Sequence, residues 1–138
     1  MFTEKEVEYL KSQHLARIAT VSPDGQPDVI PVGYEFDGQQ IYISGHDVTT
    51  TRKYKNVQAG NAKVALVVDD LKSVNPWQPR GIRIYGKAEV VRMVGRLGDG
   101  LYLRIKPAVS WSWNIESASN RPGKQGIHKA THSVPIGE

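Results

Sequence analysis

The chain has 138 residues, with 18 basic and 14 acidic side chains and a formal net charge of +4. It contains no cysteine, which excludes disulfides, zinc–thiolate sites, iron–sulfur clusters and thiol catalysis. No apolar run approaches the ~20 residues of a membrane span, the N-terminus has no signal-peptide core, and the basic residues are too dispersed for a nucleic-acid binder. We therefore expect a single cytoplasmic domain, long enough to bury a hydrophobic core.

The first residues predict a short helix. Thr3 is a good N-cap residue, and Glu6 stands three residues later, as a capping box requires. Phe2 and Val7 occupy the two positions of a hydrophobic staple. We expect this helix to have ended by His14.

Three strands joined by tight turns are predicted next. Ser22-Pro23-Asp24-Gly25 and Asp37-Gly38 have the residue types that favour turns. Pro27 and Pro31 cannot donate to a sheet ladder, so the second strand either lies at an edge there or keeps its backbone free. The predicted strands are 15–21, 26–36 and 40–44.

The second half of the chain predicts more strands after a loop and short helix at 49–57. Lys106-Pro107 is interpreted as the turn of a final hairpin. In its last strand Trp111 and Trp113 alternate with Ser110 and Ser112, which indicates a half-buried strand with one aromatic and one polar face. The predicted strands are 63–69, 81–93, 101–105 and 108–115.

These elements favour a mainly β (α+β) fold. Six or seven strands in mostly hairpin order, with short flanking helices, form a small antiparallel barrel. We expect residues 1–116 to be this domain. Residues 117–138 contain few large apolar side chains, so they predict a polar C-terminal tail that is mobile or draped over the domain.

Common catalytic motifs are absent from the sequence. There is no P-loop, no dinucleotide-binding glycine motif after a strand and no nucleophile elbow. His128 and His132 are spaced like metal ligands, but they lie in the polar tail, where a solvated segment is the better interpretation. We predict no catalytic side chain and no metal site.

The segment 49–56 carries the sharpest functional signal. Three threonines at 49–51 precede Arg52, Lys53 and Lys55, and Asn56 follows. Hydroxyls, free backbone N–H groups and cations at a helix start together favour an anion, best a phosphate. The alternative is a solvated basic first turn capped by threonine. Basic residues are normally unfavourable there, which favours the phosphate.

Two weaker signals concern ring binding. The strand segment 28–32 offers apolar side chains and few free backbone donors, so a planar ring fits against it; the alternative is an edge strand protected by proline. Trp77 is interpreted as a residue that stacks on a ring or covers a pocket, or else as a loop tryptophan fixed to the surface. Arg83 and Lys87 fall on one strand face near Arg80.

The order of these motifs resembles the pyridoxamine 5'-phosphate oxidase-like family with its flavin-binding split β-barrel. The matching segments are Leu-Ala-Arg-Ile-Ala-Thr-Val-Ser-Pro-Asp-Gly-Gln-Pro, Val-Ile-Pro-Val, Ile-Tyr-Ile-Ser and Thr-Arg-Lys-Tyr-Lys-Asn-Val. The ending at 103–116 is similar to a branch that uses coenzyme F420, an 8-hydroxy-5-deazaflavin, and includes a reductase of oxytetracycline biosynthesis. The resemblance runs from about residue 3 to residue 116.

The resemblance implies a homodimer with each cofactor in a groove between subunits. The cofactor that the resemblance implies is coenzyme F420, with FMN as the alternative. The strand at 29–32 would back the ring, and Ser44 would lie near the chain of the cofactor. The run at 50–53, with Asn56, would hold the cofactor phosphate. The pyridoxal-phosphate-binding set of the oxidase is missing, which argues against vitamin B6 oxidation. The implied cofactor-binding residues are Val29, Ile30, Pro31, Val32, Ser44, Thr50, Thr51, Arg52, Lys53, Asn56 and Trp77.

The implied activity is hydride transfer from a reduced deazaflavin to a small substrate such as an enone or quinone. Tyr34 and Tyr54 are proton-donor candidates by residue type only. An FMN-dependent oxidoreductase and a non-enzymatic cofactor- or ligand-binding protein are the rival functions. Residues 71–138 carry eleven basic and four acidic side chains, so cations there are candidates for the polyanionic coenzyme tail. They are Arg80, Arg83, Lys87, Arg121, Lys124 and Lys129.

Overall fold

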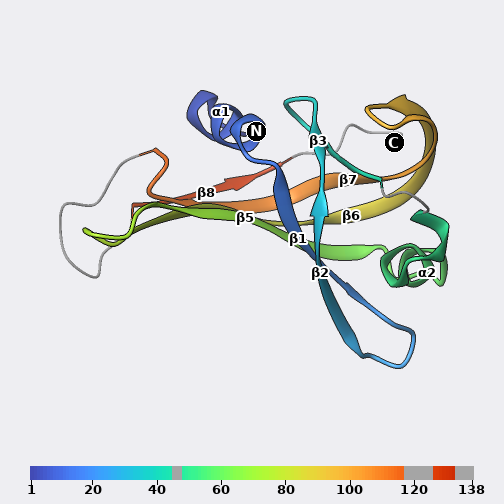
Figure 1. The fold of residues 1–138 in the computed structure, drawn as a ribbon. Helices are drawn as coiled ribbons and strands as arrows, with labels where there is room; N and C mark the ends of the chain where they lie inside the picture. Colours follow the sequence, from blue (N-terminus) through green and yellow to red (C-terminus); the bar gives the residue numbers. More distant parts are fainter. Residues whose placement is uncertain (45–47, 117–125, 133–138) are drawn as a thin grey trace.

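The structure, a computed structural model, describes residues 1–44, 48–116 and 126–132. Within these residues one antiparallel sheet of eight strands is accompanied by two α-helices and one 3-10 turn (Figure 1). No described helix has the length and apolar character needed to cross a membrane. The elements are α1 (Glu4–Ser12), β1 (Leu15–Val21), β2 (Pro27–Gly33), β3 (Glu35–Phe36), β4 (Ile41–Ile43), η1 (Val48–Thr50), α2 (Arg52–Gln58), β5 (Lys63–Ser73), β6 (Gln78–Gly95), β7 (Gly98–Trp113) and β8 (Ile127–Thr131).

The sheet is open, as a split barrel requires. Its strand order is β2-β1-β5-β6-β7-β4-β3, and β8 pairs with β7 beside this path. Strands β2 and β3 follow each other in the chain but stand at opposite ends of the path, and no described residues pair them. The predicted split β-barrel is confirmed, and the second predicted strand is an edge strand, as its prolines suggest.

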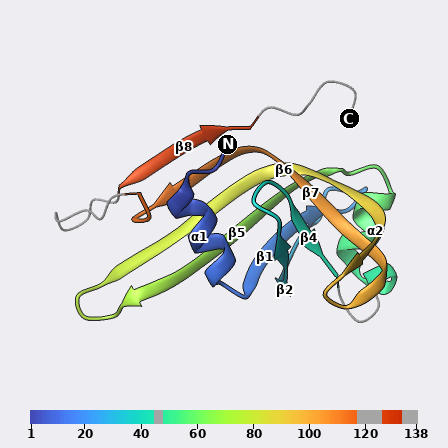
Figure 2. The same ribbon diagram turned by 90° about the horizontal axis from the view of Figure 1, so that it is seen from above.

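Helix α1 begins as predicted. The Thr3 hydroxyl accepts from the backbone N–H of Glu6 at 3.1 Å, and the Glu6 carboxylate accepts from the backbone N–H of Thr3 at 3.0 Å. Tyr9 and Leu10 are buried on the side of the helix that faces the sheet. Figures 1 and 2 show α1 lying across one face of the sheet, while the β1–β2 hairpin projects from the other face.

The hydrophobic core lies between α1 and the sheet. Every second residue of the central strands is buried, which is the period expected of a sheet with one covered face. The fully buried aliphatic side chains of these strands include Ile18, Leu66, Val68, Ile82, Ile84, Leu103 and Ile105.

The predicted hairpin at Lys106-Pro107 is wrong, because β7 runs through this dipeptide. Tyr85 pairs with Val109 and Gly86 with Pro107, so one residue of β7 bulges from the ladder. A bulge tolerates the missing N–H of proline. Gly86 is needed opposite, because a Cβ there would lie 2.5 Å from the carbonyl oxygen of Lys106.

The C-terminal part of β7 turns its serines inward and its tryptophans outward. Ser110 and Ser112 are fully buried, whereas Trp111 and Trp113 are partly exposed. An aromatic face would ordinarily be the buried one. The inversion follows from the buried Glu6 carboxylate, which accepts a hydrogen bond from the Ser112 hydroxyl at 2.5 Å.

Part of the predicted polar tail forms β8 along the edge of β7. His128 stands opposite Ser112, with its Nδ1 3.2 Å from the Glu6 carboxylate. His132 lies 2.9 Å from the Ser110 hydroxyl and packs against Phe2, with ring centroids 4.4 Å apart. Hydrogen bonds of its histidines thus help to hold the segment 127–132, which has little apolar surface, against the sheet. The rest of the predicted tail lies outside the described residues.

Candidate functional site

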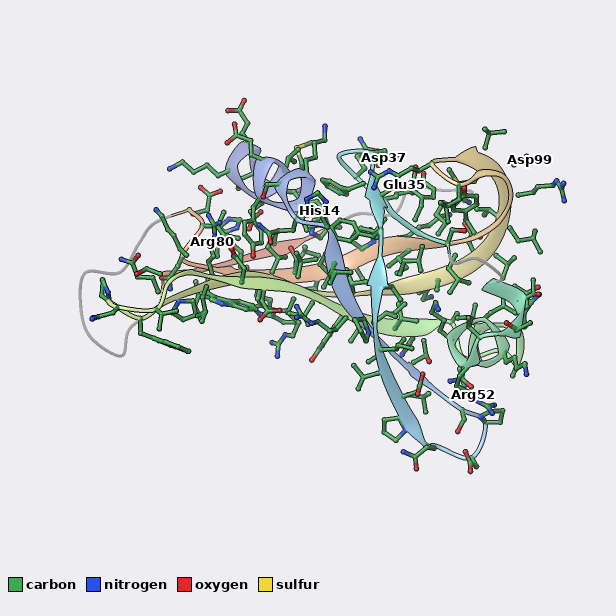
Figure 3. All side chains as sticks on the ribbon, viewed as in Figure 1. His14, Glu35, Asp37, Arg52, Arg80 and Asp99 are labelled. Carbon is green, nitrogen blue, oxygen red and sulfur yellow. The ribbon has the colours of Figure 1, made fainter. Side chains whose placement is uncertain are left out.

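The predicted anion-binding segment folds as η1 followed by α2. Thr51 is the N-cap of α2, and its hydroxyl accepts from the backbone N–H of Tyr54 at 3.4 Å. The first turn of α2 has no acidic residue. Arg52 is exposed and lies on the side of α2 that faces the β1–β2 hairpin (Figure 3). Arg52, the first of the two basic residues at the helix start, thus faces solvent.

Lys53 is buried with only 5% of its surface exposed. Burial lowers the pKa of its ammonium group, and the charge of Asp28 acts in the opposite direction. Among the described residues no carboxylate lies within ion-pair distance of its Nζ. A buried cation without a close partner is costly, and a bound anion would relieve that cost.

Asn56 is 1% exposed and lies on the same face of α2, three residues after Lys53. Its Nδ2 donates to the Thr20 hydroxyl at 2.9 Å. Its Oδ1 is buried and has no hydrogen-bond partner among the described residues. Buried polar atoms are nearly always paired, so this acceptor indicates a missing donor. A ligand that offers both an anion and a hydroxyl fits this pair of side chains.

Strand β2 brings the predicted ring-binding segment next to these residues. Asp28 stands opposite Thr20 in the β1–β2 ladder, and Thr20 holds Asn56. From this point β2 continues along the open edge of the sheet, where Val29 and Ile30 are 68% and 44% exposed and Val32 is buried. An edge strand has unpaired backbone groups on its outer side. The rest of the predicted segment, Pro31 included, thus lies on a ligand-accessible edge.

Ser44 follows β4 and lines a cavity with Tyr34 and Tyr42. Thr50 ends η1 and is exposed. Trp77 is 66% exposed in the turn between β5 and β6, at the end of the sheet opposite α2 (Figures 1 and 2). The chain therefore gathers α2, Thr20 and β2 but leaves Trp77 apart.

Sequence reasoning missed Thr20 as a member of the site, and it gave no role to the side chain of Asp28 within the predicted segment 28–32. Thr20 continues the buried alternation of Ala16 and Ile18, so a polar side chain at an inward position was the available signal. Asp28 becomes relevant only through the hairpin register, which places it opposite Thr20. Both residues approach α2 from the strand pair that carries the predicted ring segment.

The basic side chains of β6 divide between the two faces of the sheet. Arg80 makes a bidentate ion pair with Asp70 and lies over the Tyr9 ring, on the α1 side. Arg83 is exposed on the opposite face, 4.4 Å from the Trp111 ring centroid. Lys87 shares the face of Arg83, as predicted.

The two tyrosines considered as proton donors differ in their hydrogen bonds. The buried Tyr34 hydroxyl donates to the carbonyl oxygen of Leu10 at 2.5 Å, and burial raises the pKa of Tyr34 to about 12. The Tyr54 hydroxyl accepts from Gln58 at 3.0 Å. Tyr34 is therefore a packing residue in this fold.

Comparison with known proteins identifies the family and the fold of this chain. A reductase from Streptomyces rimosus, acting on 5a,11a-dehydrotetracycline and 5a,11a-dehydrooxytetracycline, is 38% identical over 83% of this chain and 84% of its own. Two solved structures share the fold at 21% identity. They are a conserved hypothetical protein of Mycobacterium tuberculosis (TM-score 0.65, 82% of this chain and 85% of that one) and an F420 reductase (TM-score 0.61, 79% and 98%). The sequence profile of pyridoxamine 5'-phosphate oxidase matches residues 2–133. The chain therefore belongs to the pyridoxamine 5'-phosphate oxidase family and is an oxidoreductase.

Proposed function

We propose that this protein is a reductase that transfers a hydride from reduced coenzyme F420 to a small organic substrate such as an enone or quinone. The curated relative is a reductase that matches most of both chains, and one protein of the same fold is named an F420 reductase. FMN is the rival coenzyme, because it also carries a phosphate and a hydroxylated chain.

The buried pair Lys53 and Asn56 carries the proposal. Among residues 1–44, 48–116 and 126–132, no carboxylate lies within ion-pair distance of Lys53, and no donor reaches the buried Oδ1 of Asn56. A phosphate would pair with the first side chain, and a hydroxyl of the adjoining chain would donate to the second. Thr50, Thr51 and the exposed Arg52 stand at the start of the same helix to contact the remaining phosphate oxygens.

The protein binds and orients the coenzyme in this proposal. When bound, the deazaflavin supplies the hydride, so no nucleophile or catalytic base is needed. The outer edge of β2 presents backbone groups to the ring edge, and the exposed side chains of Val29 and Ile30, which point to opposite faces of the sheet, flank this edge with apolar surface. Ser44 approaches from the end of β4. A reductase that draws on a reduced coenzyme also fits the expected cytoplasmic location.

We also propose that the protein forms a homodimer. The face of the sheet opposite α1 exposes Leu15, Val29, Tyr85 and Ile127, four large apolar side chains that a second copy can cover. A second copy also offers its own Trp77, which this chain keeps far from its α2. We expect Tyr85→Arg to shift sedimentation from dimer to monomer while the circular dichroism spectrum stays unchanged. A wild-type monomer at micromolar concentration contradicts this part of the proposal.

The polyanionic tail of coenzyme F420 would bind to exposed cations of this chain. With Arg80 engaged by Asp70, the described candidates for this polyanion are Arg83, Lys87 and Lys129. All three lie on exposed positions of β6 or β8. Salt screens such exposed contacts, so coenzyme F420 should lose more affinity than FMN when the ionic strength rises.

One experiment tests the proposed function. F420 and FMN are titrated into the protein by fluorescence at low and moderate salt, and oxidation of each reduced coenzyme is followed with a panel of enones and quinones. We expect tighter binding of F420 and acceptor-dependent oxidation of its reduced form. Equal or tighter binding of FMN moves the assignment to FMN, and binding without turnover of any acceptor contradicts a reductase.

A further inference from the structure

A cavity of about 140 Å³ lies between the β2–β3 connection, β4 and the turn between β6 and β7. This volume is close to that of the engineered cavity of ~150 Å³ that holds one benzene molecule. The cavity therefore has room for one six-membered ring. Its lining residues are Gly33, Tyr34, Glu35, Tyr42, Ser44, Arg96 and Leu97.

The walls of the cavity are aromatic and aliphatic. The Tyr34 hydroxyl is turned away to the carbonyl of Leu10, and the Tyr42 hydroxyl is held by the Asp37 carboxylate at 2.9 Å. Both rings thus offer carbon surface to the cavity. Leu97, which is 65% exposed at the turn, adds an apolar rim. Such a surface suits a planar apolar body.

The turn that closes the cavity is fixed to β3. The backbone N–H of Arg96 donates to both carboxylate oxygens of Glu35, each at 3.0 Å. Figure 3 shows Glu35 on β3 beside the curl of the β6–β7 hairpin, while Asp99 lies on the hairpin's outer side. The contact uses the backbone of Arg96, so it positions the turn without occupying the guanidinium group.

The Arg96 guanidinium is the cation of this cavity. It is exposed, and among the described residues no carboxylate pairs with it. Arg92, on the same hairpin, differs because its guanidinium pairs with Asp99 at 3.1 Å. A planar guanidinium recognises an ionised oxygen or carboxylate through paired hydrogen bonds.

We propose that this cavity binds one ring of a planar organic anion, with Arg96 pairing with an ionised oxygen at the edge of that ring. Because Ser44 lines the cavity and is also an expected coenzyme contact, the anion is the acidic end of the substrate. This last step rests on the proposed function. The substrate class is then a cyclic compound that carries a carboxylate, phenolate or enolate.

The test uses benzoate and its neutral isostere benzamide as probes. Each is titrated into the full chain, with and without F420, while the backbone amide NMR signals of Gly33, Ser44 and Leu97 are followed. We expect benzoate to shift these signals and to bind about fivefold more tightly than benzamide. Arg96→Gln keeps the backbone contact to Glu35 and should remove this preference. Arg92→Gln, the matched control, should retain it.

The outcomes separate this proposal from the proposed function. Equal binding of the two probes, shifts that map away from the cavity, or an unchanged preference in Arg96→Gln overturns the proposal. If F420 binds and benzoate shifts none of the cavity signals, the cavity proposal alone fails. If benzoate binds as expected and neither F420 nor FMN binds, the cavity remains an anion site and the proposed function fails.

Discussion

Two buried polar clusters of this protein differ in how completely their groups are paired. Beneath α1, the Glu6 carboxylate is contacted by the Thr3 backbone, the Ser112 hydroxyl and His128. Beneath α2, within the described part of the chain, Lys53 has no carboxylate at ion-pair distance and the Asn56 Oδ1 has no donor. A paired cluster stabilises the fold, whereas an unpaired one persists where a ligand completes it. We therefore propose that the first cluster stabilises the fold and that the second binds a ligand.

Removal of Glu6 should give the largest change in stability. Glu6→Ala takes the capping contact from Thr3 and leaves the buried Ser112 hydroxyl without its acceptor. We expect the free energy of unfolding to fall by about 2–4 kcal/mol, as measured by urea denaturation. Glu8→Ala, at an exposed position of the same helix, should change it by less than about 0.5 kcal/mol. Similar losses in the two variants would mean that the first cluster has no special role.

A smaller effect should appear as a pH dependence of stability that arises from His132, the partner of the buried Ser110 hydroxyl. Burial lowers the pKa of His132, the N-terminal amine lowers it further, and Glu6 raises it. Between its folded pKa and its ordinary value near 6.5, the unfolded chain binds more protons, so stability falls as the pH drops.

Urea denaturation at pH 7 and pH 5 measures this dependence. His132→Gln should reduce the difference in unfolding free energy between the two pH values by a few tenths of a kcal/mol, because the site is only partly buried. A steeper pH dependence in His132→Gln than in wild type would show that the sign is wrong.

The smallest stability effect is expected at Trp77. Because this side chain is 66% exposed, Trp77→Ala should change the free energy of unfolding by less than about 0.5 kcal/mol. In the proposed dimer, however, the same substitution should weaken coenzyme binding severalfold, and in the monomeric Tyr85→Arg background it should have no effect. An affinity that stays the same in the dimeric protein removes Trp77 from the site.

Local signals made several elements predictable from the sequence. The capping box at Thr3 and Glu6 and the turn at Asp37-Gly38 depend on residues a few positions apart, and both are confirmed. The basic threonine-rich segment was recognisable because its cations stand where a helix start disfavours them. Caps and turns could therefore be predicted from the sequence, because the residues that form them lie within one short segment.

Long-range partners explain what the sequence did not reveal. Ser112 faces inward because of Glu6, 106 residues earlier in the chain. Pro107 sits inside a strand because Gly86 and a bulge accept it from the neighbouring strand. The burial of Lys53 depends equally on how α2 packs against other elements. Such pairings become visible only when register and packing are known.

The most direct test of the central claim compares Lys53→Met with Lys55→Met. Both change one lysine of α2, but Lys53 is buried and Lys55 is exposed. Fluorescence titration with F420 should show about tenfold or greater loss of affinity in Lys53→Met and little change in Lys55→Met, because charge-assisted hydrogen bonds contribute roughly 1.5–3 kcal/mol. The unfolding free energy of Lys53→Met should stay within about 1 kcal/mol of wild type, because no described carboxylate lies at ion-pair distance from the ammonium that is lost. Unchanged F420 affinity in a folded Lys53→Met protein would contradict the account.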